Sequence, residues 1–363
     1  MNIGIPKERM GGEDRVGLTP AGVGLLTRAG HSCYLEGGAG SAAGFDDYDY
    51  ERNGATIVTE AEALYAKSDL ILKVLRPISE EIAWMHPGQI VMGFLGLMAA
   101  PKAELEALVA QKATLVAYEM ITPDGVDYPI LKTMSEVTGR MAPYIAGTLL
   151  MRSNGGRGVL LNGVPGISAG EVLILGAGTL GVNAARAFLG LGAKVFLLSR
   201  SLERLRCLDA QLNGQLTTMI SHDFNIAHVV RFADVVIGAV RTPGERAPQL
   251  INRQMLRTMR RGAVVLDFAI DHGGCVETSH PTTLDSPTFI EEDIVHYCVP
   301  NVPGAVPRTS THAFNNAAWP FIRALIESGP ATAFAHVPEL KKAVIIRNGD
   351  VVDEKLEAML RRS

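Results

Sequence analysis

The feature that most constrains the fold is a glycine-rich segment, residues 172–201, which reads VLILGAGTLGVNAARAFLGLGAKVFLLSRS. Its first four residues are apolar and predict a buried strand. Gly176, Gly178 and Gly181 follow in a G-x-G-x-x-G pattern that opens an alanine-rich helix, and a second apolar run comes after the helix. These glycines permit a tight turn, close approach of a pyrophosphate to the backbone, and tight helix–strand packing. The segment predicts a dinucleotide-binding unit, with an ordinary glycine-rich turn as the alternative.

The residues after the second apolar run indicate which dinucleotide is bound. An acidic residue about 20 positions after the glycines normally accepts a hydrogen bond from the ribose 2′-hydroxyl of NAD. Here that position holds Ser199, followed by Arg200 and, one turn into the next helix, Arg204. Serine removes the repulsion of a 2′-phosphate, and a guanidinium can pair with phosphate oxygens. We expect NADP(H) to be favoured over NAD(H); the alternative is a solvated Arg200 and a site for NAD.

Short apolar runs alternate with helical patterns along the rest of the chain. Strands are predicted at 69–75, 89–95, 113–119, 235–240 and 263–270. Such alternation is typical of an α/β fold whose parallel sheet carries helices on both faces. A long helix at 135–152 and a Pro-rich stretch at 299–311 flank the dinucleotide unit. We therefore expect an inserted dinucleotide-binding domain at 134–307, and a substrate domain built from 1–133 and 308–363.

Composition narrows the class of protein. The chain has 363 residues, 47% hydrophobic and 20% charged, with a net charge of −4, so we expect no nucleic-acid partner. The N-terminus lacks the apolar region of a signal peptide, and no apolar stretch is long enough to span a membrane. We expect a cytoplasmic protein. The four cysteines lie far apart and form no ligand-spaced cluster, so we expect reduced thiols and no metal site.

Several longer strings resemble those of a known family. They are EDRVGLTPAGV, MSEVTGRMA, GGRGVLLNGVPG, AIDHGGCVETSHPTT and NVPGAVPRTST. They are similar to bacterial alanine dehydrogenases and, more distantly, to the related transhydrogenase domain, over nearly the whole chain. The resemblance implies two Rossmann-like, doubly wound parallel-sheet domains with a cleft between them. It also implies an NAD-dependent, reversible conversion of L-alanine through an imine to pyruvate, and a homo-oligomer, either a hexamer or a dimer.

The resemblance implies roles for individual residues. Arg15 matches the arginine that binds the substrate carboxylate, Lys73 the lysine that contacts the substrate oxygen, and Asp271 the catalytic aspartate. A guanidinium fork fits a carboxylate. Taken singly, Arg15 or Lys73 could be a surface cation and Asp271 a turn former. Besides Ser199, Arg200 and Arg204, the expected cofactor contacts are Ser135, Gly176, Gly178, Thr179, Leu180, Gly181, Ala239, Val240 and Asn301.

Four positions depart from the family pattern. Gly96 stands where the family has a histidine that hydrogen-bonds the keto oxygen and moves a proton, so water or a larger substrate would fill the vacated space. His272 replaces a glutamine; if the chain there is extended, its side chain points away from that of Asp271, and it either binds substrate or bonds to loop backbone. Arg241 replaces an apolar residue near the expected nicotinamide position, where it either binds an anionic substrate group or faces solvent. His312 has no assigned role.

Three hypotheses of function follow. The first is an NADPH-dependent reductase of the alanine dehydrogenase family that acts on an imine or a 2-oxo acid bearing a carboxylate. The second is an ordinary NAD-dependent alanine dehydrogenase in which water replaces the histidine. The third is a non-catalytic nucleotide-binding homologue. The intact glycine pattern, together with Arg15, Lys73 and Asp271, argues against the third.

Overall fold

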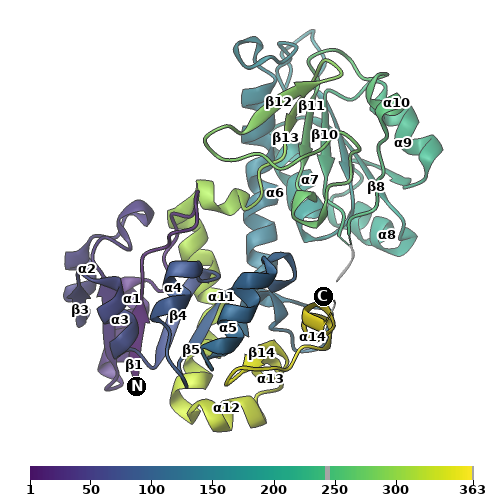
Figure 1. The fold of residues 1–363 in the computed structure, drawn as a ribbon. Helices are drawn as coiled ribbons and strands as arrows, with labels where there is room; N and C mark the ends of the chain where they lie inside the picture. Colours follow the sequence, from purple (N-terminus) through teal and green to yellow (C-terminus); the bar gives the residue numbers. More distant parts are fainter. Residues whose placement is uncertain (242–245, 362–363) are drawn as a thin grey trace. The chain divides into compact units, whose positions relative to one another are not determined.

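A computed structural model describes residues 1–241 and 246–361. The chain divides into two compact units (Figure 1). Unit 1 comprises Met1–Met134 and Pro303–Ser363, and unit 2 is the continuous segment Ser135–Val302. In the described parts of the chain, no helix combines the length and apolar character that a membrane crossing requires.

Unit 2 contains a seven-stranded sheet in the order β12-β13-β11-β10-β7-β8-β9. The strands are β7 (Glu171–Leu175), β8 (Lys194–Ser199), β9 (Thr217–Ile220), β10 (Val235–Gly238), β11 (Val264–Asp267), β12 (Thr288–Glu291) and β13 (Ile294–Tyr297). Only the edge pair β12–β13 is antiparallel. The order reverses between β7 and β10, and such a switch point is where open α/β sheets bind ligands, at the carboxyl ends of the strands.

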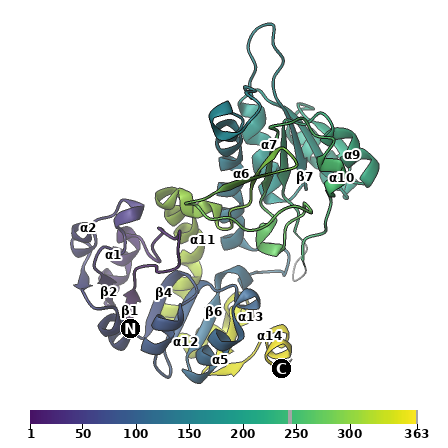
Figure 2. The ribbon, with the colours of Figure 1, turned by 45° about the horizontal axis from the view of Figure 1, so that its top comes forward.

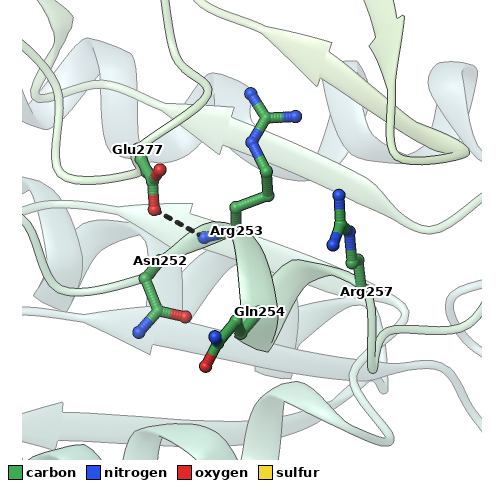
Figure 3. Close-up of a pocket in the computed structure, with 5 residues that line it drawn as sticks. All are labelled: Asn252, Arg253, Gln254, Arg257 and Glu277. Atoms are coloured by element: carbon green, nitrogen blue, oxygen red, sulfur yellow. Dashed lines mark hydrogen bonds between the residues drawn. The ribbon is translucent and has the colours of Figure 1, made fainter.

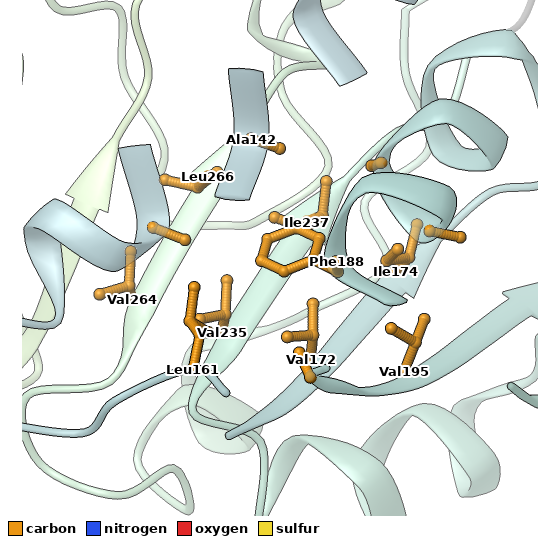
Figure 4. Close-up of a cluster of buried hydrophobic side chains, with 14 of the residues drawn as sticks. Ala142, Leu161, Val172, Ile174, Phe188, Val195, Val235, Ile237, Val264 and Leu266 are labelled. Atoms are coloured by element: carbon orange, nitrogen blue, oxygen red, sulfur yellow. The ribbon is translucent and has the colours of Figure 1, made fainter. Parts of the chain in front are cut away.

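Alternation along β7 explains why helices cover both faces of this sheet. Val172 and Ile174 point to one face, where they pack with Phe188 of α7 (Thr179–Gly190) and Ala142 of α6 (Pro129–Leu149) (Figure 4). Leu173 and Leu175 point to the opposite face, where they belong to a second apolar cluster with residues of α9 (Asp223–Val230). Successive side chains of a strand point to opposite faces, so an unbroken apolar run requires cover on both sides. The other helices of this unit are α8 (Leu202–Gln211) and α10 (Arg253–Leu256).

Unit 1 contains an eight-stranded sheet in the order β15-β14-β6-β5-β4-β1-β2-β3. The strands are β1 (Asn2–Ile5), β2 (Ser32–Glu36), β3 (Ala55–Val58), β4 (Leu70–Leu75), β5 (Ile90–Phe94), β6 (Thr114–Ala117), β14 (Val344–Arg347) and β15 (Asp350–Val351). The first six pair in parallel, whereas β14 is antiparallel to both of its neighbours. Chain order reverses between β1 and β4, so this sheet also has a switch point.

The helices of unit 1 come from both ends of the chain (Figure 2). They are α1 (Pro20–Arg28), α2 (Asp47–Glu51), α3 (Ala61–Lys67), α4 (Ser79–Trp84), α5 (Lys102–Ala110), α11 (Pro307–Ser328), α12 (Pro330–His336), α13 (Pro338–Ala343) and α14 (Glu354–Arg361). Thr19 caps α1 by accepting a hydrogen bond from the backbone N–H of Gly22. The predicted α/β class with two doubly wound sheets is confirmed, with antiparallel strands added at one edge of each sheet.

Candidate active site

The glycine pattern forms the turn between β7 and α7. Gly176 has a φ of +114°, and its N–H donates to the carbonyl oxygen of Leu198 at 2.8 Å. A Cβ at Gly176 would lie 2.3 Å from the carbonyl oxygen of Ala239, and a Cβ at Gly181 would lie 1.9 Å from that of Gly176. Both contacts are far too short for a side chain. The turn therefore requires glycine at both positions, and it lies beside the residue that follows β10.

The middle glycine differs from the other two. Gly178 is the N-cap residue of α7, and a Cβ built there would meet no heavy atom within 4 Å. The first-turn N–H groups of a helix, here those of Thr179 and Leu180, have no intrahelical partner and carry partial positive charge. An open backbone at this end of a twelve-residue helix fits the pyrophosphate of a dinucleotide.

The end of β8 carries the residues expected to select the dinucleotide. Ser199 is the last residue of the strand and is 9% exposed; its Oγ accepts from the N–H of Ser201 at 3.3 Å. Ser201 in turn caps α8, because its side chain accepts from the N–H of Arg204. Arg200 and Arg204 are exposed, and neither forms an ion pair with the residues that the structure describes. Both guanidinium groups are therefore available to a phosphate.

The remaining expected cofactor residues lie in three other segments of unit 2. Ala239 and Val240 follow β10 directly, beside Gly176. Ser135 lies in α6, one turn before Gly139, whose Cβ position is 2.5 Å from the carbonyl oxygen of Leu180. The glycine at 139 thus lets α6 approach the start of α7. Asn301 follows β13 and has a φ of +56°.

In unit 1, Lys73 lies in β4 at the switch point and is completely buried. Its Nζ lies 2.6 Å from a carboxylate oxygen of Glu81 and 3.2 Å from one of Glu8. Burial alone would favour the neutral amine, but the two carboxylates outweigh that effect and raise the pKa of Lys73. The pKa of the Glu8 carboxyl is also raised, chiefly by burial. Lys73 is therefore a buried cation, not the surface cation of the alternative interpretation.

Arg15 is equally buried, at 2% exposure, in the loop between β1 and α1. Its Nε donates to Glu13 Oε1 at 2.7 Å, and its Nη1 lies 3.0 Å from the sulfur of Met134. A Cβ at Gly17, two residues further on, would lie 2.0 Å from the carbonyl oxygen of Leu72. This close approach brings the loop of Arg15 against β4 next to Lys73. The structure thus places the two predicted substrate-binding cations at the same edge of the sheet.

Gly96 follows β5 at that edge and adopts a left-handed conformation, with a φ of +53° and a ψ of 33°. Its N–H donates to Glu119 Oε1 at 2.6 Å, and the N–H of Leu95 donates to the other oxygen at 3.2 Å. A Cβ at Gly96 would meet nothing within 4 Å. The position expected to have lost a histidine therefore opens onto free space.

Asp271 and His272 lie in unit 2 after β11. The strand ends at Asp267, and Ile270–His272 forms a 3₁₀ turn. The predicted strand at 263–270 therefore extends too far, and the chain at 271–272 is not extended, so the condition under which the two side chains would point to opposite faces is not met. The cause is the buried carboxylate of Asp267, which accepts from the N–H groups of Ala269, Cys275 and Val276 and folds the chain back.

The turn gives these two side chains different electrostatic surroundings. Asp271 is accessible to solvent, yet the partial loss of solvation around its carboxyl raises its pKa to about 6. His272 is half-buried, and its pKa is lowered by burial and by the positive charge of Arg241. A carboxyl group that titrates near neutrality suits proton transfer.

Two further features are His312, in unit 1, and a surface hollow on unit 2. His312 packs against the ring of Phe45, with centroids 5.3 Å apart and planes at 81°. Figure 3 shows a hollow on unit 2 that is lined by Asn252, Arg253, Gln254, Arg257 and Glu277. Arg253 and Arg257 both pair with Glu292, at 2.6 and 3.0 Å.

Sequence reasoning missed the acidic residues that hold the predicted groups in place. Glu13 holds Arg15, Glu8 and Glu81 hold Lys73, and Glu119 fixes the backbone at Gly96. One signal was available for Asp267. An acidic residue at the end of the apolar run VVLD has to find hydrogen-bond donors if it is buried.

The fold and this arrangement of residues define the class of protein: an oxidoreductase with a pyridine-nucleotide cofactor. The N-terminal domain model of the alanine dehydrogenase/PNT family matches residues 4–138, and the C-terminal domain model matches residues 142–354. The chain belongs to the alanine dehydrogenase/PNT family.

Individual relatives agree with this assignment. The chain is 44% identical over 357 residues to an alanine dehydrogenase of Mycobacterium tuberculosis (strain CDC 1551 / Oshkosh), covering 98% of this chain and 96% of the relative. It is 41% identical over 359 residues to an alanine dehydrogenase of Geobacillus stearothermophilus, and the match covers 99% of this chain and 96% of that relative. A solved L-alanine dehydrogenase structure matches with a TM-score of 0.95 and 38% identity, covering 99% and 98%. A transhydrogenase of Sinorhizobium meliloti, 23% identical over 98% and 100% of the chains, shares the fold with a TM-score of 0.83.

Proposed function

We propose that the protein is an NADPH-dependent reductase that acts on an imine or a 2-oxo acid bearing a carboxylate. The end of β8 is the observation that carries the cofactor choice. Ser199 offers a hydroxyl where a carboxylate would repel a 2′-phosphate, and Arg200 and Arg204 are exposed beside it without an ion-pair partner among the described residues. Bound NADPH supplies the hydride.

The residues of unit 1 fit the capture of an acidic, carbonyl-bearing substrate. Arg15 is expected to bind the carboxylate, with Glu13 holding its guanidinium in position. Lys73, kept charged by Glu8 and Glu81, is expected to polarise the substrate oxygen. Asp271 of unit 2, with a pKa of about 6, is expected to bind or transfer a proton. Gly96 leaves open space where the family has an imidazole, and this favours a substrate larger than pyruvate.

The cofactor choice is tested by titrating the full-length protein with NADPH and NADH while nucleotide fluorescence is followed. We expect NADPH to bind about tenfold more tightly or better, which corresponds to about 1.4 kcal/mol. Ser199→Asp should reverse the preference, because it restores the repulsive carboxylate. Arg231→Gln, which removes an exposed charge of unit 2 at the C-cap of α9, is the control and should leave the ratio unchanged. Equal affinities for the two nucleotides in the unmodified protein would contradict the proposal.

A second candidate is an ordinary NAD-dependent alanine dehydrogenase, which the 44% identity to an alanine dehydrogenase favours. In that case water occupies the space at Gly96 and does the work of the missing imidazole. The two candidates differ in the turnover of the unmodified protein with L-alanine. A rate near the enzyme median of about 10 s⁻¹ supports the second candidate, whereas general acid–base losses of about 10²–10⁴-fold support the first.

A further inference from the structure

The buried lysine of β4 contacts one carboxyl group more than its charge requires. The Nζ of Lys73 lies 3.2 Å from a carboxylate oxygen of Glu8 and 2.6 Å from one of Glu81, and the three side chains are at most 1% exposed. With all three groups ionised, this cluster would carry a net charge of −1 away from solvent. An uncompensated charge in the interior is strongly disfavoured, so the cluster favours a proton on one of its two carboxyl groups.

The charged neighbours of the cluster do not remove this surplus, because they are paired with one another. Arg9 Nη1 lies 3.8 Å from Glu81, but the same atom donates to Glu36 at 3.0 Å. Glu13, which also acts on the cluster, accepts from Arg15 Nε at 2.7 Å. Each of these two pairs is neutral overall.

Two buried tyrosines also face Glu8. Burial is the main cause that raises the pKa of the Tyr65 hydroxyl and that of the Tyr118 hydroxyl, and the charge of Glu8 adds to it in both. Both hydroxyls are therefore neutral at pH 7. Neither provides a positive charge to an ionised Glu8.

The contacts of the two carboxyl groups favour a proton on Glu8. Glu81 is the closer one to Lys73, and it also accepts from the Tyr65 hydroxyl at 3.1 Å and from a backbone N–H at the start of α4 at 2.9 Å. Such contacts stabilise a carboxylate. Glu8 lies farther from the cation, and burial raises its pKa against the smaller opposing effects of Lys73 and of the Val74 N–H, which donates at 2.6 Å.

We propose that Glu8 carries a proton in the resting protein and passes it to Lys73 after Lys73 has protonated the substrate oxygen. This inference rests on the proposed function, which assigns the substrate oxygen to Lys73. Glu8 acts on the substrate only through Lys73 and is thus a positioning residue. It gives unit 1 a proton source that does not depend on an imidazole at Gly96.

The proton and electron balance is simple. When ammonia or a primary amine displaces the oxygen of a 2-oxo acid, that oxygen leaves as water with two protons, one from the attacking nitrogen and one from Lys73. The product is an iminium ion, which accepts the hydride. The O–H bond of Glu8 breaks as an N–H bond of Lys73 forms, so the lysine is charged again and the Glu8 carboxylate recovers its proton from water.

Infrared spectroscopy of the full-length protein at pH 7 tests the resting proton without any substrate. A protonated carboxyl group has a C=O stretching band separate from those of carboxylates and amides, and we expect Glu8→Gln to remove one such band. Glu104→Gln is the matched control, because Glu104 pairs with Arg76 at 3.4 Å elsewhere in unit 1, and it should keep the band. Absence of the band from the unmodified protein, or its survival in Glu8→Gln, overturns the proposal.

Urea unfolding identifies which of the two carboxyl groups is neutral. Glutamine keeps the shape and the neutral charge of a protonated Glu8, so the urea midpoint of Glu8→Gln should be no lower than that of the unmodified protein. Glu81→Gln should lower the midpoint, because it removes the charged partner of Lys73. The opposite order of midpoints would place the proton on Glu81 and overturn the proposal.

The transfer step is tested by turnover of pyruvate and ammonium with NADPH as the pH is varied. At low pH we expect the kcat of Glu8→Gln to be about 10²-fold lower than that of the unmodified protein, with KM for pyruvate changed by less than about threefold. The ratio of the two kcat values should approach one at high pH, where the unmodified Glu8 has also lost its proton. Glu104→Gln should match the unmodified protein throughout.

Two outcomes of the turnover measurement count against the proposal. A kcat of Glu8→Gln equal to that of the unmodified protein, or lowered by a factor that does not change with pH, overturns the transfer step. Absence of turnover by the unmodified protein rejects the proposed function and the transfer step with it. That failure is distinguishable from an error about Glu8, because the infrared band reports the resting proton independently of activity.

Discussion

The buried cations of unit 1 depend on carboxylate partners that a sequence motif does not identify. A lysine or arginine without a counter-charge would be strongly disfavoured in the interior. Lys73 and Arg15 could be predicted from the sequence as candidates, because each matches a residue of the family that the sequence resembles. Their partners Glu8, Glu81 and Glu13 could not, because the fold decides which acidic side chain reaches which cation.

Asp271 is expected to make the stability of the folded protein depend on pH. Its pKa is raised from 3.8 to about 6 by desolvation, so the folded state binds the proton more tightly than the unfolded state. Below about pH 3.8 the carboxyl is neutral in both states and costs nothing. Above pH 3.8 the unfolded state releases its proton while the folded state still holds it, so the free energy of unfolding falls. This loss is complete once the pH has risen through 6, where the folded state carries a poorly solvated charge.

Asp271→Asn removes this charge and keeps the shape of the side chain. We therefore expect the Tm of the variant to exceed that of the unmodified protein at pH 8, and the difference to shrink as the pH falls from about 6 to 4. Differential scanning fluorimetry across this range measures it. Asp285→Asn, at an exposed carboxyl elsewhere in unit 2, is the control. A Tm difference that is constant with pH would contradict the assignment.

Whole elements were easier to predict than their ends. β4, β5 and β6 lie within the predicted ranges, because apolar runs between turn residues are a property of the local sequence. β11 ends three residues before the predicted boundary, because Asp267 draws three N–H groups onto its carboxylate. The predicted helix at 135–152 instead begins at Pro129, a residue that suits the first turn of a helix, and ends at Leu149. Non-local hydrogen bonds and end effects decide such boundaries.

Glu81 links the strand β4 to the start of the helix α4. Besides pairing with Lys73 of β4, it accepts from the N–H of Ile78 at the start of α4. Glu81→Gln leaves Lys73 buried with Glu8 alone, and we expect a loss of about 3 kcal/mol in the free energy of unfolding of unit 1. Both tryptophans of the chain, Trp84 and Trp319, lie in unit 1, so their fluorescence in a urea titration reports on that unit.

The control for this measurement is Asp127→Asn, also in unit 1. Asp127 pairs with Lys132 at 3.3 Å, but the two side chains are 49% and 47% exposed, so the pair is worth at most about 1 kcal/mol. If Glu81→Gln lowers the free energy of unfolding no more than the control does, Glu8 alone is sufficient to stabilise the buried charge of Lys73.

The two sheets share one topological feature. Each sheet reverses its strand order next to its first strand. Gly96 and Asp271 follow the carboxyl ends of central strands, whereas Lys73 lies within β4. The residues proposed to select the cofactor, Ser199, Arg200 and Arg204, all lie in unit 2, whereas the expected carboxylate ligand Arg15 lies in unit 1. Unit 2 is also continuous in sequence and has an apolar cluster on each face of its sheet. This organisation implies that cofactor discrimination belongs to unit 2 alone.

The segment 135–302, expressed by itself, tests that implication. We expect it to unfold cooperatively on heating, because both faces of its sheet are covered from within the segment. Its NADPH-to-NADH affinity ratio should lie within about threefold of the full-length value, because the two nucleotides differ at the 2′-phosphate and the residues proposed to read it are all present. NADPH should raise its Tm in proportion to the logarithm of concentration above Kd. Ser199→Asp in the same segment should invert the ratio. A folded segment that binds both nucleotides equally would place the source of discrimination outside unit 2.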